Sequence, residues 1–272
     1  MRRSDDVSFL TWQYDEPCSF LYEAQTSCVV SGSDIWRWVA YCFVESYFDV
    51  DNEARETATA YHADSQSGDC YMDPCTFGRF PLDDNIKDPR DWFLLVFGCR
   101  LHQIKGEWRQ VVWKVVKSVH DYEKAHRCLL APPGKNRSSR EARLRNEEIL
   151  QSVQWVVAAR NLSTRLSRCL TRTVQACERF CSTSAAYFDD VPGALHIASS
   201  FCAIQTSFDD LKSLMNTLED ATHFCDCFVQ NASYLPLFRL SEFQGSPLTL
   251  YLCSLNFNSA SAKASSQSRT MA

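Results

Sequence analysis

The fold of this chain is decided by residues 88–124, which read DPRDWFLLVFGCRLHQIKGEWRQVVWKVVKSVHDYEK. Asp88 can cap a helix start, and Pro89 suits the first helical position because the N–H that it lacks would have no helical partner there. Apolar residues then recur in steps of 4, 3, 4, 3, 4, 4 and 3. They are Phe97, Leu101, Ile104, Trp108, Val111, Val115, Val119 and Tyr122. This spacing predicts a long, coiled-coil-like helix that packs along another helix.

A second long helix is predicted over residues 191–229. Asp190 is a suitable cap, and Pro192 lies just inside the predicted start. Its apolar positions, spaced mostly by 4 and 3, are Ile197, Phe201, Ile204, Phe208, Leu211, Met215, Leu218, Ala221, Cys225 and Phe228. We expect 88–124 and 191–229 to be the two longest helices, and antiparallel packing would bury both apolar stripes.

Between these helices lies a basic segment, residues 127–172, with a linker near 127–145. The run Ala131–Ser139 contains Pro132, Pro133 and Gly134 and should interrupt the helix, which resumes near Ser139 with a less regular apolar pattern. Its arginines indicate either a solvated helix face or a surface for phosphate or anionic lipid. Aromatic residues are sparse there apart from Trp155, so we expect no nucleic-acid partner.

The N-terminal part, residues 1–87, is predicted to be α+β and rich in loops. Residues 35–44 are aromatic and β-branched, which favours a strand over a helix capped by Ser33-Asp34. One short helix is expected over Asp51–Tyr61. Residues 231–272 end in a serine- and alanine-rich run and predict an irregular to disordered tail. The predicted fold class is therefore mainly α, with three parts: 1–87, 88–230 and 231–272.

Composition narrows the function. The 272 residues are 45% hydrophobic, enough for a sizeable core, and the net charge of −5 disfavours a protein built to bind nucleic acid. No apolar run reaches about 18 residues, so no membrane-spanning segment is expected. The N-terminus does not resemble a secretory signal, and the 14 cysteines are therefore expected to be reduced thiols in the cytoplasm.

Cysteine and histidine offer one candidate metal site, in two halves. Its residues are His223, Cys225 and Cys227, with His62, Cys70 and Cys75 as the second half. Cys225 and Cys227 would lie on different faces of a helix, so ordinary thiols are the favoured interpretation and no zinc is expected. Cys177 and Cys181 share a helix face, where core positions are favoured over a redox pair.

Acidic residues gather before the first long helix, at Asp64, Asp69, Asp73, Asp83, Asp84 and Asp88. Such oxygen ligands suit Mg²⁺ or Ca²⁺, but the spacing does not match an EF-hand, and a solvated acidic loop is favoured. No catalytic triad order, glycine-rich phosphate loop or HExxH pattern occurs. We expect no enzyme, no catalytic residue and no metal ligand. The candidate interaction residues are the two helix stripes: Phe97, Leu101, Ile104, Trp108, Val111, Val115, Ile197, Phe201, Ile204, Phe208, Leu211 and Met215.

Several short motifs resemble a known family. They are Phe9–Trp12, Gly32–Asp34, Trp38–Val44 with Tyr47-Phe48, Met72–Pro74, Asp88–Phe93, Arg100-Leu101 and Glu107-Trp108. Together they resemble the cytosolic part of fungal CorA-like magnesium-transporter-related proteins over residues 9–124. The likeness is weaker over 190–230 and faint at Leu255–Asn258 and Ser268–Met271.

The resemblance implies an α/β-plus-helical cytosolic domain, a long stalk helix, two membrane helices and a Gly-Met-Asn signature for Mg²⁺ in a homopentamer. This chain lacks Gly-Met-Asn and membrane helices, so no pore residue is carried over. The resemblance then implies a soluble, non-catalytic relative, whether regulatory, truncated or degenerate, that cannot conduct ions alone. Its implied partners are further copies of itself or a full-length relative, and Mg²⁺ is the one ion implied. The alternative is a free-standing helical protein-interaction module, and the third option is a lipid or nucleic-acid binder.

Overall fold

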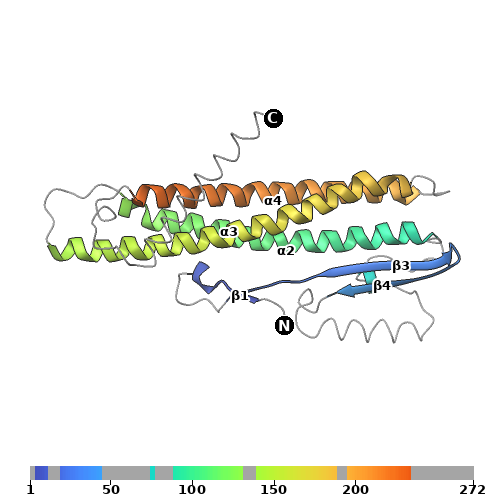
Figure 1. The fold of residues 1–272 in the computed structure, drawn as a ribbon, viewed down its shortest axis with the longest axis horizontal. Helices are drawn as coiled ribbons and strands as arrows, with labels where there is room; N and C mark the ends of the chain where they lie inside the picture. The colour runs from blue at the N-terminus through green and yellow to red at the C-terminus, as the bar shows by residue number, and fades with distance from the viewer. Residues whose placement is uncertain are drawn as a thin grey trace, which may run out of the picture. The chain divides into compact units, whose positions relative to one another are not determined.

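The computed structural model describes residues 4–11, 19–44, 74–76, 88–130, 139–188 and 195–233. Three long helices dominate it: α2 (Pro89–His126), α3 (Ser139–Phe188) and α4 (Leu195–Ser233). Short 3-10 helices occur at η1 (Ser8–Leu10), η3 (Pro74–Thr76) and η4 (Arg127–Leu130). The predicted fold class, mainly α with a smaller N-terminal part containing strands, is confirmed (Figure 1).

The N-terminal strands form two antiparallel pairs. Strand β1 (Ser4–Asp6) pairs with β2 (Phe20–Tyr22), and β3 (Thr26–Asp34) pairs with β4 (Arg37–Val44). The strand predicted within residues 35–44 is therefore confirmed from Arg37 onward. Between β3 and β4 the Asp34 carboxylate accepts a hydrogen bond from the Trp36 backbone N–H at 2.8 Å, which holds the turn instead of capping a helix.

Helix α3 corrects one prediction. It has 50 residues, whereas α2 has 38 and α4 has 39, so 88–124 and 191–229 are not the two longest helices. The apolar pattern of α3 was less regular because small residues occupy inward positions. Ala159 and Ser163 are both fully buried, and neither contributes strongly to a count of large apolar residues. The predicted caps Asp190 and Pro192, the helix over 51–61 and the tail beyond Ser233 lie outside the described residues.

The chain divides into two compact units, 1–124 with 158–225 and 125–157 with 226–272. In the second unit, the buried apolar residues are Ile149, Val153, Val156, Phe228 and Ala232. There the Arg145 guanidinium donates a hydrogen bond to the Leu129 carbonyl at 2.8 Å, which ties the start of α3 to η4. The candidate sites described below, other than His223–Cys227, lie in the first unit.

Contacts within the first unit fix the helix directions. The Phe180 ring of α3 lies 4.9 Å from the Phe97 ring of α2 and 6.3 Å from the Phe201 ring of α4. Further along, Lys105 of α2 contacts Asp210 of α4. Helices α2 and α4 therefore run parallel to each other, and α3 runs antiparallel to both, as Figure 1 shows. Antiparallel packing through α3 lets three helices bury one another's apolar sides.

Helix α2 is covered on a second side that the apolar spacing did not predict. Trp92, Val96 and Arg100 follow one another at four-residue intervals and are all buried. Trp92 meets the strands, since its ring lies 5.6 Å from the ring of Trp38 in β4. This second side places the inner face of the β3–β4 hairpin against α2, so α2 is buried more completely than a single stripe predicts.

Candidate functional site

The residues predicted to form interaction stripes pack against one another within one chain. Six are buried: Leu101, Val115, Ile197, Ile204, Phe208 and Leu211. The others are half-buried: Phe97, Ile104, Trp108, Val111, Phe201 and Met215. Contacts such as the hydrogen bond from the Thr171 hydroxyl to the Met215 sulfur, 3.3 Å, join α3 to α4. Core packing accounts for their spacing, and a role in binding a partner stays a prediction.

Five phenylalanine rings gather where α2 begins and α3 ends: Phe93, Phe97, Phe180, Phe188 and Phe201. Phe180 is central, because its ring centroid lies within 6.3 Å of all four others. Tilted and stacked ring pairs add about 0.5–1.5 kcal/mol each beyond area burial. Phe93, Phe180 and Phe188 were absent from the predicted stripes, since their contacts join segments far apart in the sequence.

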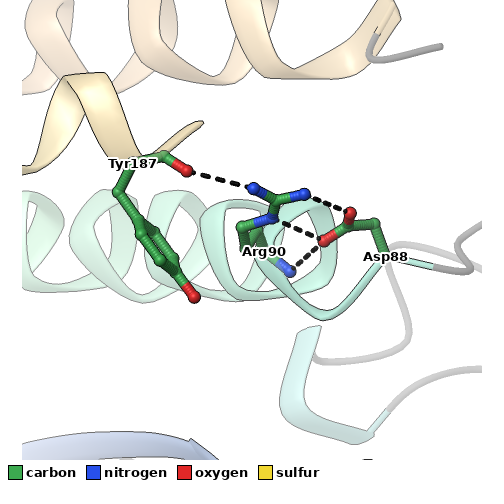
Figure 2. Close-up of polar contacts among 3 residues, drawn as sticks. All are labelled: Asp88, Arg90 and Tyr187. Carbon is green, nitrogen blue, oxygen red and sulfur yellow. Dashed lines mark hydrogen bonds and ion pairs between the residues drawn. The ribbon is translucent and has the colours of Figure 1, made fainter. Parts of the chain in front are cut away.

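Two helix ends are joined by one arginine (Figure 2). The Asp88 carboxylate accepts hydrogen bonds from the Arg90 backbone N–H at 2.8 Å and from the Arg90 Nη2 at 2.9 Å, which confirms Asp88 as the cap of α2. The Arg90 Nη1 donates to the Tyr187 carbonyl in the last turn of α3, at 3.2 Å. Arg90 therefore satisfies a carbonyl that the end of α3 leaves without a helical partner. Its hydrogen bonds also lower the pKa of Asp88, against the opposing effect of partial burial.

Ion pairs attach α4 to both of its neighbours. The Lys105 ammonium of α2 lies 2.9 Å from the Asp210 carboxylate, and the Lys212 ammonium lies 2.6 Å from Glu178 of α3. The hydrogen bond from Lys105 lowers the pKa of Asp210, and the bond to Glu178 raises the pKa of Lys212. Charges at these positions fix how α4 is aligned along α2 and α3, while contributing little energy each.

The hairpin has an outward side that carries exposed apolar residues. Side chains alternate along β3 and β4, so Thr26, Cys28 and Val30 are half-buried while their neighbours are exposed. We define the outer hairpin face as Val29, Val39, Tyr41 and Phe43, whose exposed fractions run from 51% to 63%. Val29 lies directly opposite Tyr41, and the Tyr41 and Phe43 rings are stacked with centroids 6.5 Å apart. Exposed apolar groups gathered on one face are typical of interaction surfaces.

The candidate metal and redox residues on α3 and α4 differ in how far they are buried. His223 is exposed, Cys225 is buried and Cys227 is half-buried on α4. Cys177 is buried, and burial raises its pKa to about 11, which suits an inert core thiol. Within the described ranges, no group of three or more His, Cys, Asp or Glu could hold a metal ion. His62, Cys70 and the acidic residues from Asp64 to Asp84 lie outside those ranges.

The arginines of α3 in the first unit lie mainly at the surface. Arg165, Arg168 and Arg172 are exposed, and Arg160 is half-buried. The Arg165 Nη1 lies 3.2 Å from the Asp5 carboxylate of β1, so this arginine joins α3 to the N-terminal strands. At least one member of the basic segment therefore has a structural role.

None of the helices that the structure describes contains an apolar stretch that could span a lipid bilayer. No family model, no curated protein and no solved structure matches this chain. Function is therefore inferred from the motifs, contacts and exposed surfaces given above.

Proposed function

We propose that this chain is a non-catalytic relative of the cytosolic region of CorA-like magnesium transporters, acting in assembly and unable to conduct ions alone. The observation that carries the proposal is the bundle of α2, α3 and α4, which have 38, 50 and 39 residues. In the sequence, this bundle follows an N-terminal region that contains most of the family-like motifs. Long helices that lie side by side suit a protein whose role is to hold subunits together. On this proposal the chain works in the cytoplasm beside a membrane-bound relative.

The contacts between helices support a rigid module. Arg90 joins α2 to the end of α3, and Lys105 joins α2 to α4. Because such contacts lie at the start and near the middle of α2, the three helices should move as one body within the first unit. No residue of this chain is proposed as a magnesium ligand, and Mg²⁺ is expected to act on the degree of self-association.

Sedimentation velocity of the full chain at several concentrations, with and without millimolar Mg²⁺, tests the proposal. We expect weak self-association that depends on concentration and strengthens with Mg²⁺ but not with the same ionic strength of NaCl. A chain that stays monomeric in every condition, with Mg²⁺ present or absent, would contradict it. A tight pentamer that survives dilution would support family-like assembly but contradict weak association.

A free-standing helical interaction module is the second candidate, and the outer hairpin face favours it. The helix stripes are already packed within one chain, whereas the four residues of the outer hairpin face stay exposed, as do Phe20 and Tyr22 of β2. The occupant it would take is a second copy of the chain, since two apolar sheet faces can stack about 10 Å apart.

Paired substitutions separate the two candidates. Tyr41→Ser with Phe43→Ser removes the largest side chains of the outer hairpin face. The matched control is Trp113→Ser, which changes an equally exposed aromatic on α2. Loss of self-association in the hairpin variant but not in the control, with no effect of Mg²⁺, supports the second candidate. Association that depends on Mg²⁺ and persists in both variants supports the first.

A further inference from the structure

Three thiols meet at the inner face of the β3–β4 hairpin. Cys28 of β3 lies directly opposite Cys42 of β4 in the strand register, and both side chains are half-buried. The Cys42 thiol is also within hydrogen-bonding reach of Cys75 in η3. Cys75 is half-buried as well, so the cluster is accessible to a small solute while lying between strand and helix. From the sequence, only Cys75 stood out, as part of a candidate metal site, because nothing in the spacing of the three cysteines places them together.

A buried arginine lies beside the thiols. Arg100 of α2 is only 7% exposed, and its guanidinium interacts with the Cys42 sulfur both by charge and by a hydrogen bond. Hydrogen bonds from Cys28 and then Cys75, together with Arg100, lower the pKa of Cys42 to about 3 although burial opposes the change. An electropositive, partly exposed setting of this kind is what separates reactive cysteines from structural ones.

Other cysteines of the same unit show the opposite behaviour. Burial raises the pKa of Cys177 to about 11, and it also raises the pKa of Cys181. The pKa of Cys169 is raised by partial desolvation and by the nearby Glu23 carboxylate. These three cysteines of α3 therefore serve as internal references, against which the reactivity of the Cys42 thiol can be compared.

We propose that Cys28, Cys42 and Cys75, with Arg100, form a peroxide-sensitive thiol site in which Cys42 is oxidised and then joined to Cys28 by a disulfide. Cys28 is the expected partner because directly opposed residues of an antiparallel pair have Cα atoms about 4.5–5.5 Å apart, within the range that a disulfide spans. This inference is independent of the function proposed above.

The chemistry balances with a hydroperoxide as the oxidant. The Cys42 thiolate attacks one peroxide oxygen, the S–O bond forms and the O–O bond breaks, giving Cys42 sulfenic acid and hydroxide, which takes a proton from solvent. The Cys28 sulfur then attacks the Cys42 sulfur, the S–S bond forms and the S–O bond breaks. The leaving hydroxide takes the proton of the Cys28 thiol. In total two thiols and one hydrogen peroxide give one disulfide and two waters, and thiol reductants reverse it.

The decisive measurement is the pH profile of each thiol in the reduced, full-length chain. Iodoacetamide labelling, read peptide by peptide by mass spectrometry, gives the rate at Cys42 and at Cys169 between pH 5 and 8. We expect the Cys42 rate to stay nearly constant, while the Cys169 rate rises about tenfold per pH unit because its thiolate fraction does. A profile at Cys42 that rises as steeply as that of Cys169 would overturn the proposal, and this test needs no variant.

Peroxide treatment tests the product. Stoichiometric hydrogen peroxide should yield a Cys28–Cys42 disulfide, and Cys28→Ser should instead leave a sulfenic acid at Cys42 that dimedone traps. Cys202→Ser, which changes an exposed cysteine of α4, is the matched control and should leave the disulfide yield unchanged. Arg100→Lys should retain the flat pH profile and Arg100→Met should make it steeper, with circular dichroism reporting the fold of each. Random pairing among cysteines, or stoichiometric zinc that shields all three thiols, would contradict the proposal.

Discussion

The Lys105 ammonium of α2 lies 2.9 Å from the Asp210 carboxylate of α4, and it joins residues 105 positions apart in the chain. The Lys105 side chain is 12% exposed and that of Asp210 is 42% exposed, so solvent screens part of the attraction. The pair therefore aligns two parallel helices more than it stabilises them.

Removing one charge of this pair should lower the stability of the folded chain by a small, measurable amount. We expect Asp210→Asn to lower the free energy of unfolding by about 0.5–1 kcal/mol in urea titrations, because Lys105 is largely buried and loses its carboxylate. Asp209→Asn, at the exposed neighbouring position, is the control and should change stability by less. Equal effects of the two variants would mean that the interhelical pair contributes nothing of its own.

Lowering the pH should reduce the free energy of unfolding, because Asp88 and Asp210 become protonated. Both have a lowered pKa in the folded chain, caused first by hydrogen bonds from Arg90 and Lys105 respectively. Each contribution is therefore fully present above the unfolded pKa near 4 and is lost as pH falls through the lower folded pKa. Urea midpoints at pH 6 and pH 3 should differ less in Asp88→Asn than in the unsubstituted chain. An unchanged pH dependence in this variant would show that Asp88 does not contribute to the loss of stability in acid.

The α4 stripe should behave as core. Ile204 and Leu211 are both 0% exposed, so Ile204→Asp or Leu211→Asp would bury an unpaired carboxylate at a cost above about 4 kcal/mol. We expect loss of helical circular dichroism or of cooperative unfolding at 25 °C. Asn216→Asp places the same charge at an exposed position of α4 and should stay folded. A folded monomer in the Ile204 variant would instead identify the stripe as an interface between chains.

Two glycines should respond to alanine with opposite signs. A Cβ at Gly32 would lie 2.5 Å from the Arg37 carbonyl oxygen and 2.6 Å from the Trp38 Cβ, so the hairpin would have to shift. At Gly106, within α2, a Cβ would meet nothing within 4 Å. Gly106→Ala should raise the free energy of unfolding by about 1 kcal/mol through helix propensity, and Gly32→Ala should lower it by about 1–3 kcal/mol. Urea titrations measure the free energy of unfolding of both variants. Stabilisation by Gly32→Ala would contradict the close approach of β3 and β4 at this position.

Removing the central phenylalanine of the cluster should destabilise the fold more than removing an exposed aromatic ring elsewhere on α2. Phe180 contacts four other rings from α2, α3 and α4. We expect Phe180→Ala to lower the free energy of unfolding by about 3 kcal/mol, the lower end for a core phenylalanine because the ring is half-buried. Trp113→Ala, which removes an exposed ring on α2, is the control and should change stability by less than about 0.5 kcal/mol. Similar losses in both variants would contradict the role of the cluster.

Local features of this chain were predictable from its sequence, whereas features that depend on packing between distant segments were not. Asp88 and Pro89 predicted the start of α2, and the aromatic and β-branched run predicted β4, because caps and strand preference act within a few residues. The length of α3 was missed because small inward residues such as Ala159 and Ser163 carry little hydrophobic signal. The stripe on α2 was located, but its burial within one chain could not be read from spacing that fits an intermolecular coiled coil equally well.

By itself, the sequence determined that this chain is mainly helical, where α2 begins and that a strand lies within residues 35–44, since backbone hydrogen bonds and side-chain period are set by neighbours along the chain. Only the tertiary structure decided that Trp92, Val96 and Arg100 form a second buried side of α2. Likewise it alone brought Cys28, Cys42 and Cys75 to Arg100 and the Arg90 guanidinium to the Tyr187 carbonyl. The reason is physical: these groups are separated by tens of residues, and their distances depend on how the chain returns on itself, which no local pattern records.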